Sequence, residues 1–340
     1  MNFTFTDTLS TEQLSEVMKL YSASEVVSLE QYPEFVKAIE PDVSLKYLLA
    51  YRDGQLIGYS CVKIKKRVLA YVYFGPMVSS PQDYEEVCAG LVSVCRGKGV
   101  LVLKIMPPYM SDERKAAMSS FQKIKYTQSD SEFNWASLKL SLDKPMEEIL
   151  KGFSDNHRQS VKKGQKLNLT ADVITDVDDL NIFAEQYIQM YQSRALAIDP
   201  ELIRHTFKLL FDFYRAQDTG VFLAVRSPTE GIVGGVCISY QGDSGFYQKG
   251  YSHPDHRSLP INHLAIYEAI KLSKEHGLKV FDFGGYGLNL KEDDQVHAIN
   301  RFKAWFGGEL VYHPQTLTIY TTPFSKLIYD LYLRLRKSAG

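Results

Sequence analysis

Cysteine is scarce in this sequence. The 340 residues include four cysteines, and no two of them form a C-x-x-C pair. This spacing argues against a zinc site built on cysteine pairs and against a dithiol redox site. Cys88 and Cys95 are seven residues apart, so a helix would place both on one face, and we expect them at small buried core positions. Few, unpaired cysteines are most consistent with a protein of a reducing compartment.

Long apolar runs are also missing. The longest ones, such as 100–103, are far shorter than the ~18 residues needed to cross a bilayer. The N-terminal sequence MNFTFTDTLSTEQ lacks the positive start and apolar stretch of a signal peptide. We therefore expect a cytoplasmic protein.

Neither sign of charge dominates. Lys and Arg total 39 and Asp and Glu total 40, which gives a net charge of -1. This balance argues against a protein whose whole surface binds nucleic acid, but it is compatible with a local basic groove. With 45% hydrophobic and 23% charged residues, the composition is that of a globular protein, and the length suggests two domains.

The sequence contains the same α/β pattern twice. Each copy is predicted as two strands joined by a tight turn, a third strand, a helix and a closing strand. The first copy comprises strands 47–50, 56–64 and 68–74, helix 84–95 and strand 100–105, and the second comprises strands 221–225, 232–240 and 246–251, helix 262–276 and strand 280–283. We therefore predict an α/β (α+β) fold of two related domains with mixed sheets flanked by helices.

A basic segment separates the two copies. A helix starting near residue 146 would turn Ile149 and Phe153 inward and its cations outward. The predicted organisation is an N-terminal domain over 1–145, a basic linker helix over 146–164 and a C-terminal domain over 165–340. The linker is either a solvated connection or the basic lip of a groove that receives phosphate.

Several stretches together resemble the Fem family of aminoacyltransferases, which build peptidoglycan cross-bridges. They are "DNHRQSVKKGQKLNLTADV", "YQKGYSHPDHRSLPINHLAIYEAIKLSKEHGLKVFDFGG" and "RFKAWFGGELVYHP" in the second half, and "SLEQYPEFVKAI" and "LLAYRDGQLIGYSCVKIKKRVLAYVYFGPMV" in the first. The resemblance implies two tandem acyl-CoA N-acyltransferase-like (GNAT-like) domains. No sustained heptad pattern is present, so we expect no coiled-coil arm of the kind that some members carry.

The resemblance implies an enzyme that transfers an aminoacyl group from aminoacyl-tRNA to an amine on the stem peptide of a peptidoglycan precursor. Two alternatives stay open. One is an acyl-CoA-dependent N-acyltransferase acting on an amino sugar or peptide, and the other is a non-catalytic muropeptide-binding module. The expected partners are a muropeptide or other amine acceptor and, as donor, tRNA or acyl-CoA.

Two residues are candidates for catalysis. Lys303 in "RFKAWFGG" matches the family's catalytic-site lysine, and its compact cation suits a developing oxyanion. Asp282 alternates with two aromatic residues along its strand, so it points to the opposite face, where it could orient Lys303 or steer the amine. The structural alternatives are a surface ion pair for Lys303 and a carboxylate that caps backbone amides for Asp282.

Further residues are candidates for substrate binding. Alternation places Tyr247, Lys249 and Tyr251 on one face of a strand, where they line a pocket or cover an exposed sheet. The guanidinium groups of Arg204 and Arg158 match the oxygens of a diphosphate, although each could simply be solvated.

Two glycines and two histidines complete the candidates. Gly284 and Gly285 end the strand that carries Asp282, and we predict that they contact substrate. His253 and His256 lack an evident third ligand, so no metal is predicted, and no cofactor other than the co-substrate.

The C-terminal stretch 323–337 is amphipathic. Its leucines and isoleucine fall on one side, with basic residues elsewhere. It is predicted to be a helix that docks on the second domain, or a peripheral membrane contact that would serve a lipid-linked acceptor.

Overall fold

The computed structural model describes residues 1–24, 27–40, 43–108, 121–129, 135–292, 294–313 and 315–338. The chain forms two compact units. Unit 1 comprises 1–134 and 312–340, and unit 2 comprises 135–311.

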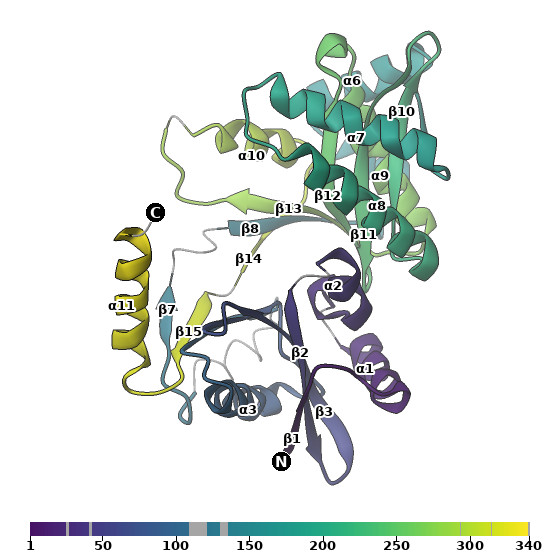
Figure 1. The fold of residues 1–340 in the computed structure, drawn as a ribbon. Helices are drawn as coiled ribbons and strands as arrows, with labels where there is room; N and C mark the ends of the chain where they lie inside the picture. The colour runs from purple at the N-terminus through teal and green to yellow at the C-terminus, as the bar shows by residue number, and fades with distance from the viewer. Residues whose placement is uncertain are drawn as a thin grey trace. The chain divides into compact units, whose positions relative to one another are not determined.

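Unit 1 is a mixed sheet with helices on its faces (Figure 1). Its helices are α1 (Thr11–Ala23), α2 (Pro33–Ile39), α3 (Tyr84–Gly97) and α11 (Ser325–Ser338). Its strands are β1 (Asn2–Thr6), β2 (Ser44–Arg52), β3 (Gln55–Lys65), β4 (Leu69–Tyr73), β5 (Met77–Val78), β6 (Val102–Met106), β7 (Thr127–Ser129) and β15 (Thr316–Tyr320).

Unit 2 has the same kind of architecture. Its helices are α5 (Met146–Lys151), α6 (Asp155–Lys166), α7 (Val177–Gln192), α8 (Pro200–Gln217), α9 (Ile261–Glu275) and α10 (Val296–Ala304). Its strands are β8 (Trp135–Ser141), β9 (Thr170–Val173), β10 (Gly220–Ser227), β11 (Gly231–Gln241), β12 (Ser244–Ser252), β13 (Val280–Gly287) and β14 (Glu309–Tyr312).

The two sheets share one strand order, as the duplication predicts. The order is β1-β2-β3-β4-β6-β15-β7 in unit 1 and, read in the matching direction, β9-β10-β11-β12-β13-β8-β14 in unit 2. The pairings match as well, because β4 and β6 are parallel, as are β12 and β13. The hairpin turn at Asp53 and Gly54 is confirmed, and both residues have positive φ, of 51° and 80°.

The structure groups the residues differently from the predicted domain boundaries. β15, near the C-terminus, pairs with β6 in unit 1, and β8, which follows the unit 1 residues in sequence, pairs with β13 in unit 2. The antiparallel neighbour of β6 therefore comes from the part of the chain that follows unit 2. The antiparallel neighbour of β13 comes directly after the first segment of unit 1. The segment 146–164 is two helices, α5 and α6, separated at Gly152, and both belong to unit 2.

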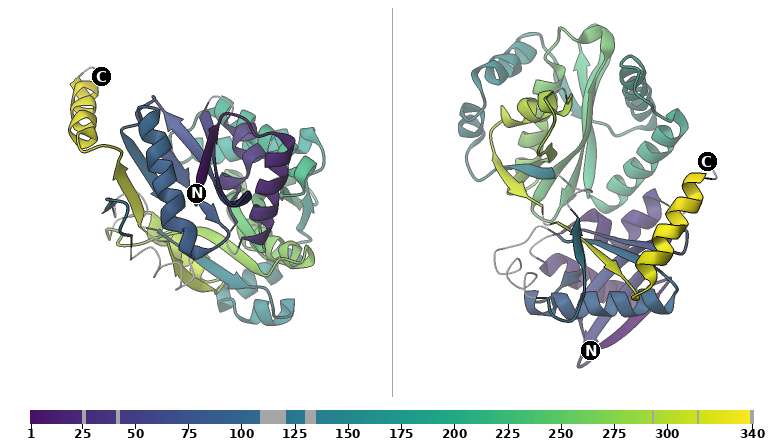
Figure 2. Two further views of the ribbon diagram at one scale, coloured as in Figure 1. Left: turned by 90° about the horizontal axis from the view of Figure 1, so that it is seen from below. Right: turned by 90° about the vertical axis from the view of Figure 1, so that its left-hand side faces the viewer.

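Helices cover both faces of each sheet (Figure 2). In unit 1, α3 packs on one face, where Gly58 leaves room for Val87, and α1 contacts β3. In unit 2, α9 packs on one face, and α7 and α8 supply aromatic residues such as Phe183 and Phe207 to the other. Both cores therefore lie between sheet and helices.

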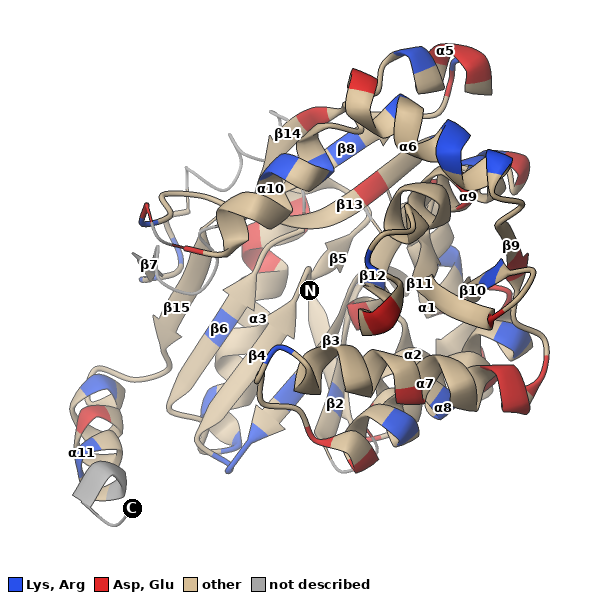
Figure 3. Ribbon diagram, turned by 90° about the horizontal axis from the view of Figure 1, so that it is seen from above, with Lys and Arg blue, Asp and Glu red and all other residues tan. Residues whose placement is uncertain are grey.

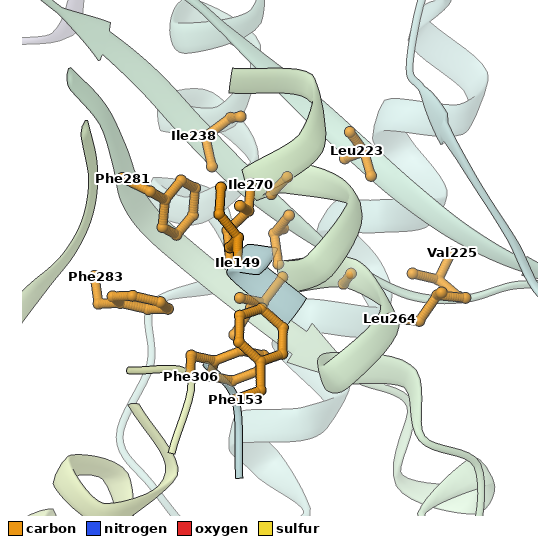
Figure 4. Packing of buried hydrophobic residues seen from close by; sticks show 14 of the residues in the cluster. Ile149, Phe153, Leu223, Val225, Ile238, Leu264, Ile270, Phe281, Phe283 and Phe306 are labelled. Carbon is orange, nitrogen blue, oxygen red and sulfur yellow. The ribbon is translucent and has the colours of Figure 1, made fainter. Parts of the chain in front are cut away.

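A hydrophobic cluster of unit 2 brings together residues from the beginning and the end of the unit's sequence (Figure 4). Phe153 after α5 and Phe306 after α10 have ring centroids 5.1 Å apart, and Phe306 lies 5.6 Å from Phe283 on β13. This packing fixes the end of α10 against β13. All four cysteines are buried, which confirms the expectation for Cys88 and Cys95, and burial raises the pKa of the Cys95 thiol to about 12. Within the described ranges, no helix is both long and apolar enough to span a bilayer.

Candidate active site

The two parallel strands of unit 2 separate part-way along their length. Residues Ser244–Phe246 of β12 pair with Val280–Asp282 of β13, and their pairing ends there although both strands continue. The matching strands of unit 1 stay paired over all of Leu69–Tyr73. Backbone groups beyond Phe246 and Asp282 are therefore released from this ladder, unlike those of the matching strands in unit 1.

A bulge shapes β13 at the point of separation. The register with β8 shifts between Asp282 and Gly285, so the paired glycines do not end the strand as predicted but continue it to Gly287. Gly284 has φ +69° and lies close to Phe246, so a side chain there would be strained as well as crowded. The Gly284 amide donates a hydrogen bond of 2.8 Å to Asp282 Oδ1.

Lys303 projects from α10 onto this bulge. Its Nζ donates a hydrogen bond of 2.7 Å to the Gly285 carbonyl and lies 5.9 Å from the centre of the Tyr247 ring. Burial lowers the pKa of the Lys303 ammonium to about 8, and the Asp282 carboxylate partly offsets this effect. The lysine is therefore anchored in the site, unlike the surface ion pair considered as its alternative.

Asp282 supports the bulge. The residue is 3% exposed, and its Oδ2 lies 3.7 Å from Lys139 Nζ. Burial raises the pKa of the carboxyl, and Lys139, the Gly284 amide, Ser137 and Lys303 oppose that rise. Because Asp282 holds the Gly284 amide, it shapes the backbone that presents the Gly285 carbonyl to Lys303.

The predicted common face of Tyr247, Lys249 and Tyr251 is wrong. The register of β11 and β12 shifts at a second bulge, where Tyr247 pairs with Ile238 and Lys249 pairs with the adjacent Cys237. Since neighbouring residues of β11 point to opposite faces, Tyr247 and Lys249 do so too. Tyr247 packs on the core cluster beside Lys303, whereas the Tyr251 ring lies 4.7 Å from Phe183 of α7.

The two predicted diphosphate anchors already have partners. Arg204 forms hydrogen bonds of 2.5 and 3.1 Å with the Glu185 carboxylate and one of 2.6 Å with Glu201. Arg158 pairs with Asp155 and donates to the carbonyls of Lys151 and Phe153 around the end of α5. Neither guanidinium contacts the Lys303 region through these bonds, and phosphate binding by either residue stays a prediction.

Asn300 was missed by the sequence reasoning. Its side-chain amide bonds both backbone groups of Gly287, accepting from the N–H at 3.0 Å and donating to the carbonyl at 2.7 Å. The side chain is 5% exposed. Asn300 and Lys303 are three residues apart and so share a helix face, a spacing that could have marked the pair. Together they join α10 to the end of β13.

His157 of α6 contacts the backbone of α10 next to Lys303. Its ring is 1% exposed, and Nε2 lies 3.1 Å from the Phe302 carbonyl. Burial lowers its pKa, and the pKa of neighbouring His263 falls to about 4 for the same reason. A neutral His157 therefore donates Nε2–H to the carbonyl directly before Lys303.

We expect Asn300→Asp to lower the transfer rate because a carboxylate oxygen would face the Gly287 carbonyl where the amide now donates. The buried mismatch should cost about 1–3 kcal/mol of unfolding free energy and release α10 from β13. The exposed Asn156→Asp on α6 is the matched control. Urea unfolding and initial-rate measurements check both variants, and an Asn300→Asp enzyme with native rate and stability would contradict this role.

Across the described ranges, no group of three or more His, Cys, Asp or Glu side chains is arranged to hold a metal ion. His253 and Asp255 approach to 3.9 Å, within the 3-10 turn Pro254–His256 and its cap. The bulge offers a half-buried ammonium, the Gly285 carbonyl that it contacts and the buried carboxylate of Asp282.

Sequence comparison places this site in a known domain type. Residues 151–303 match the family model described as an acetyltransferase (GNAT) domain. The chain is 32% identical over 88 residues to the Lipid II:glycine glycyltransferase of Staphylococcus haemolyticus, which is 26% of this chain and 21% of that protein. It is 29% identical over 117 residues to the enzyme of the same name from Staphylococcus aureus, 32% and 26% of the two chains. The matches thus span about a fifth to a quarter of these relatives.

Solved structures extend the similarity to the whole fold. The crystal structure of FemX superposes with a TM-score of 0.79 at 16% identity, covering 96% of this chain and 100% of FemX. The resemblance to the Fem family is confirmed. A tandem GNAT protein from the clavulanic acid biosynthesis pathway superposes with a TM-score of 0.59 at 13% identity, covering 95% and 99%. The predicted tandem GNAT-like fold is therefore also confirmed.

Proposed function

We propose that this chain is an N-acyltransferase that moves an aminoacyl group from aminoacyl-tRNA to an amine on the stem peptide of a peptidoglycan precursor. The observation that carries the proposal is Lys303, whose ammonium is held by the Gly285 carbonyl where β12 and β13 separate. Relatives named for glycyl transfer to lipid II support the acceptor class.

The reaction needs a stabilised oxyanion and a route for one proton. The acceptor amine attacks the ester carbonyl of the aminoacyl group, so that a C–N bond forms while the ester C–O bond breaks. The amine loses a proton and the departing hydroxyl of the tRNA gains one. In this proposal the Lys303 ammonium stabilises the oxyanion of the tetrahedral intermediate.

The charge on α6 supports tRNA as the donor. The helix carries Arg158, Lys162, Lys163 and Lys166 against a single acidic residue, Asp155 (Figure 3). Lys162, Lys163 and Lys166 are exposed, and α6 packs against α9 in the same unit as Lys303. A local cationic helix can bind a phosphate backbone even though the whole chain has a net charge of -1.

A donor screen tests the proposal against its alternatives. The protein would be incubated with radiolabelled aminoacyl-tRNA or acyl-CoA, each with a muropeptide acceptor. We expect label in the muropeptide from aminoacyl-tRNA only. Transfer from acyl-CoA alone would favour the second enzyme hypothesis, and muropeptide binding without transfer from either donor would favour a binding module.

The screen should include both carriers of the acceptor. A nucleotide-linked muropeptide is water-soluble, whereas a lipid-linked one lies at a membrane surface. If the lipid-linked form is the acceptor, the proposed function includes peripheral membrane contact. Comparing the transfer rates to the two forms identifies the preferred carrier.

A further inference from the structure

The C-terminal helix α11 leaves a stripe of large apolar side chains exposed. Phe324 is 70% exposed, Leu327 71%, Ile328 48% and Leu331 56%. Their spacing of three, four and seven residues places them along one face of the helix. An exposed row of this kind on a charged helix marks an interaction surface.

The base of α11 is held firmly to unit 1. Thr321 Oγ1 donates a hydrogen bond of 2.5 Å to the Val100 carbonyl, and Ser325 Oγ accepts one of 3.1 Å from the Thr322 amide. Both side chains are buried. Beyond this base, Figure 3 shows α11 standing apart from the sheet of unit 1. The helix is thus fixed at its start, with its apolar stripe exposed.

The charge of α11 selects among partners. By sequence the helix has four basic residues and one acidic residue, giving a net charge of +3. A symmetric contact with a second copy would bring two such helices together and repel them. A nucleic acid would use the cations but not the apolar stripe. An anionic bilayer surface takes both the apolar face and the basic residues.

We propose that α11 is an interfacial helix that docks unit 1 on an anionic lipid membrane. Phe324, Leu327, Ile328 and Leu331 insert at the level of the headgroups, and the basic residues contact acidic phosphates. The proposal deepens the proposed function, because it assigns residues to the membrane contact that a lipid-linked acceptor requires. Its binding test is independent of catalysis.

The test is co-sedimentation of the full chain with vesicles. We expect binding to equimolar phosphatidylglycerol and phosphatidylcholine vesicles and much weaker binding to phosphatidylcholine alone. The double variant Leu327→Ser, Leu331→Ser should lower the partition coefficient by roughly tenfold or more. Lys326→Gln should lower it about fivefold, because one basic residue near an anionic surface contributes about that factor.

The matched control is Ile182→Ser, Leu202→Ser, which removes two exposed apolar side chains from α7 and α8 of unit 2. It should bind vesicles like the native protein. Equal vesicle binding by the α11 double variant would overturn the proposal. So would absence of vesicle binding with a dimer in sedimentation velocity that the α11 variant dissociates, since that result assigns the stripe to a second copy.

Transfer to a water-soluble, nucleotide-linked muropeptide separates this proposal from the proposed function. The α11 variants should keep that activity, because the helix lies in unit 1 and Lys303 in unit 2. If the native protein binds vesicles but transfers nothing from any donor, the proposed function fails while the membrane contact stands.

Discussion

Lys303→Met should lower kcat for aminoacyl transfer by about 10²- to 10³-fold, which corresponds to roughly 3–4 kcal/mol of lost transition-state stabilisation. Methionine keeps the length and apolar stem of lysine but cannot place a cation at the Gly285 carbonyl. KM should change little, because the charge is needed mainly when the oxyanion develops. Steady-state kinetics with the donor identified by the screen measures both constants.

The fold of the Lys303→Met variant should be preserved. Burial lowers the pKa of Lys303 from 10.5 to about 8, so at pH 7 the protonated side chain destabilises the folded state relative to the unfolded one. Methionine removes that cost, and the melting temperature should stay equal or rise. Lys279→Met, at an exposed position of unit 2, is the matched control and should leave kcat unchanged. Loss of acceptor affinity alone would make Lys303 an anchor rather than a catalytic residue.

Phe306→Ala should destabilise unit 2 by about 3–5 kcal/mol. Phe306 is fully buried, and its ring contacts Phe153, His157, Phe283 and Phe302 at centroid distances of 5.1, 4.4, 5.6 and 5.3 Å. The cavity would lie between α10 and β13, so activity should fall together with stability. Urea unfolding, with hydrogen exchange of unit 2 amides, measures the change.

Phe324→Ala provides the comparison for this prediction. Phe324 is 70% exposed at the start of α11, and its removal should change the unfolding free energy by less than about 0.5 kcal/mol. A Phe306→Ala protein as stable as the Phe324→Ala protein would mean that the aromatic cluster does not hold α10 in place.

The repeated strand and helix pattern allowed most of the fold to be predicted. Local signals such as Asp53-Gly54 determine the hairpins, and the same order of elements in both halves implies the same sheet. The pattern could not predict that β8 joins the sheet of unit 2 and that β15 joins the sheet of unit 1. Both are short strands that suit the position beside a closing strand, and only long-range pairing decides which sheet each one joins.

The site was predicted in part. Lys303 and Asp282 were proposed from a motif and from alternation, and both bond backbone groups of the same bulge. The bulges themselves were not found, since alternation assumes a regular strand, and this assumption put Tyr247 on the wrong face. The role of Arg204 was harder to predict. The sequence does not reveal that its guanidinium already forms hydrogen bonds with the Glu185 carboxylate.

The pH dependence of kcat tests most directly whether Lys303 acts as a cation. The ratio of the native rate to that of Lys303→Arg cancels titration of the acceptor amine, because arginine stays charged throughout. Since the Lys303 pKa is about 8, the ratio should be constant below pH 7 and fall about tenfold per pH unit above pH 8 as the ammonium is lost. A ratio that rises through pH 8 would show that neutral Lys303 acts as a base and would contradict the oxyanion role.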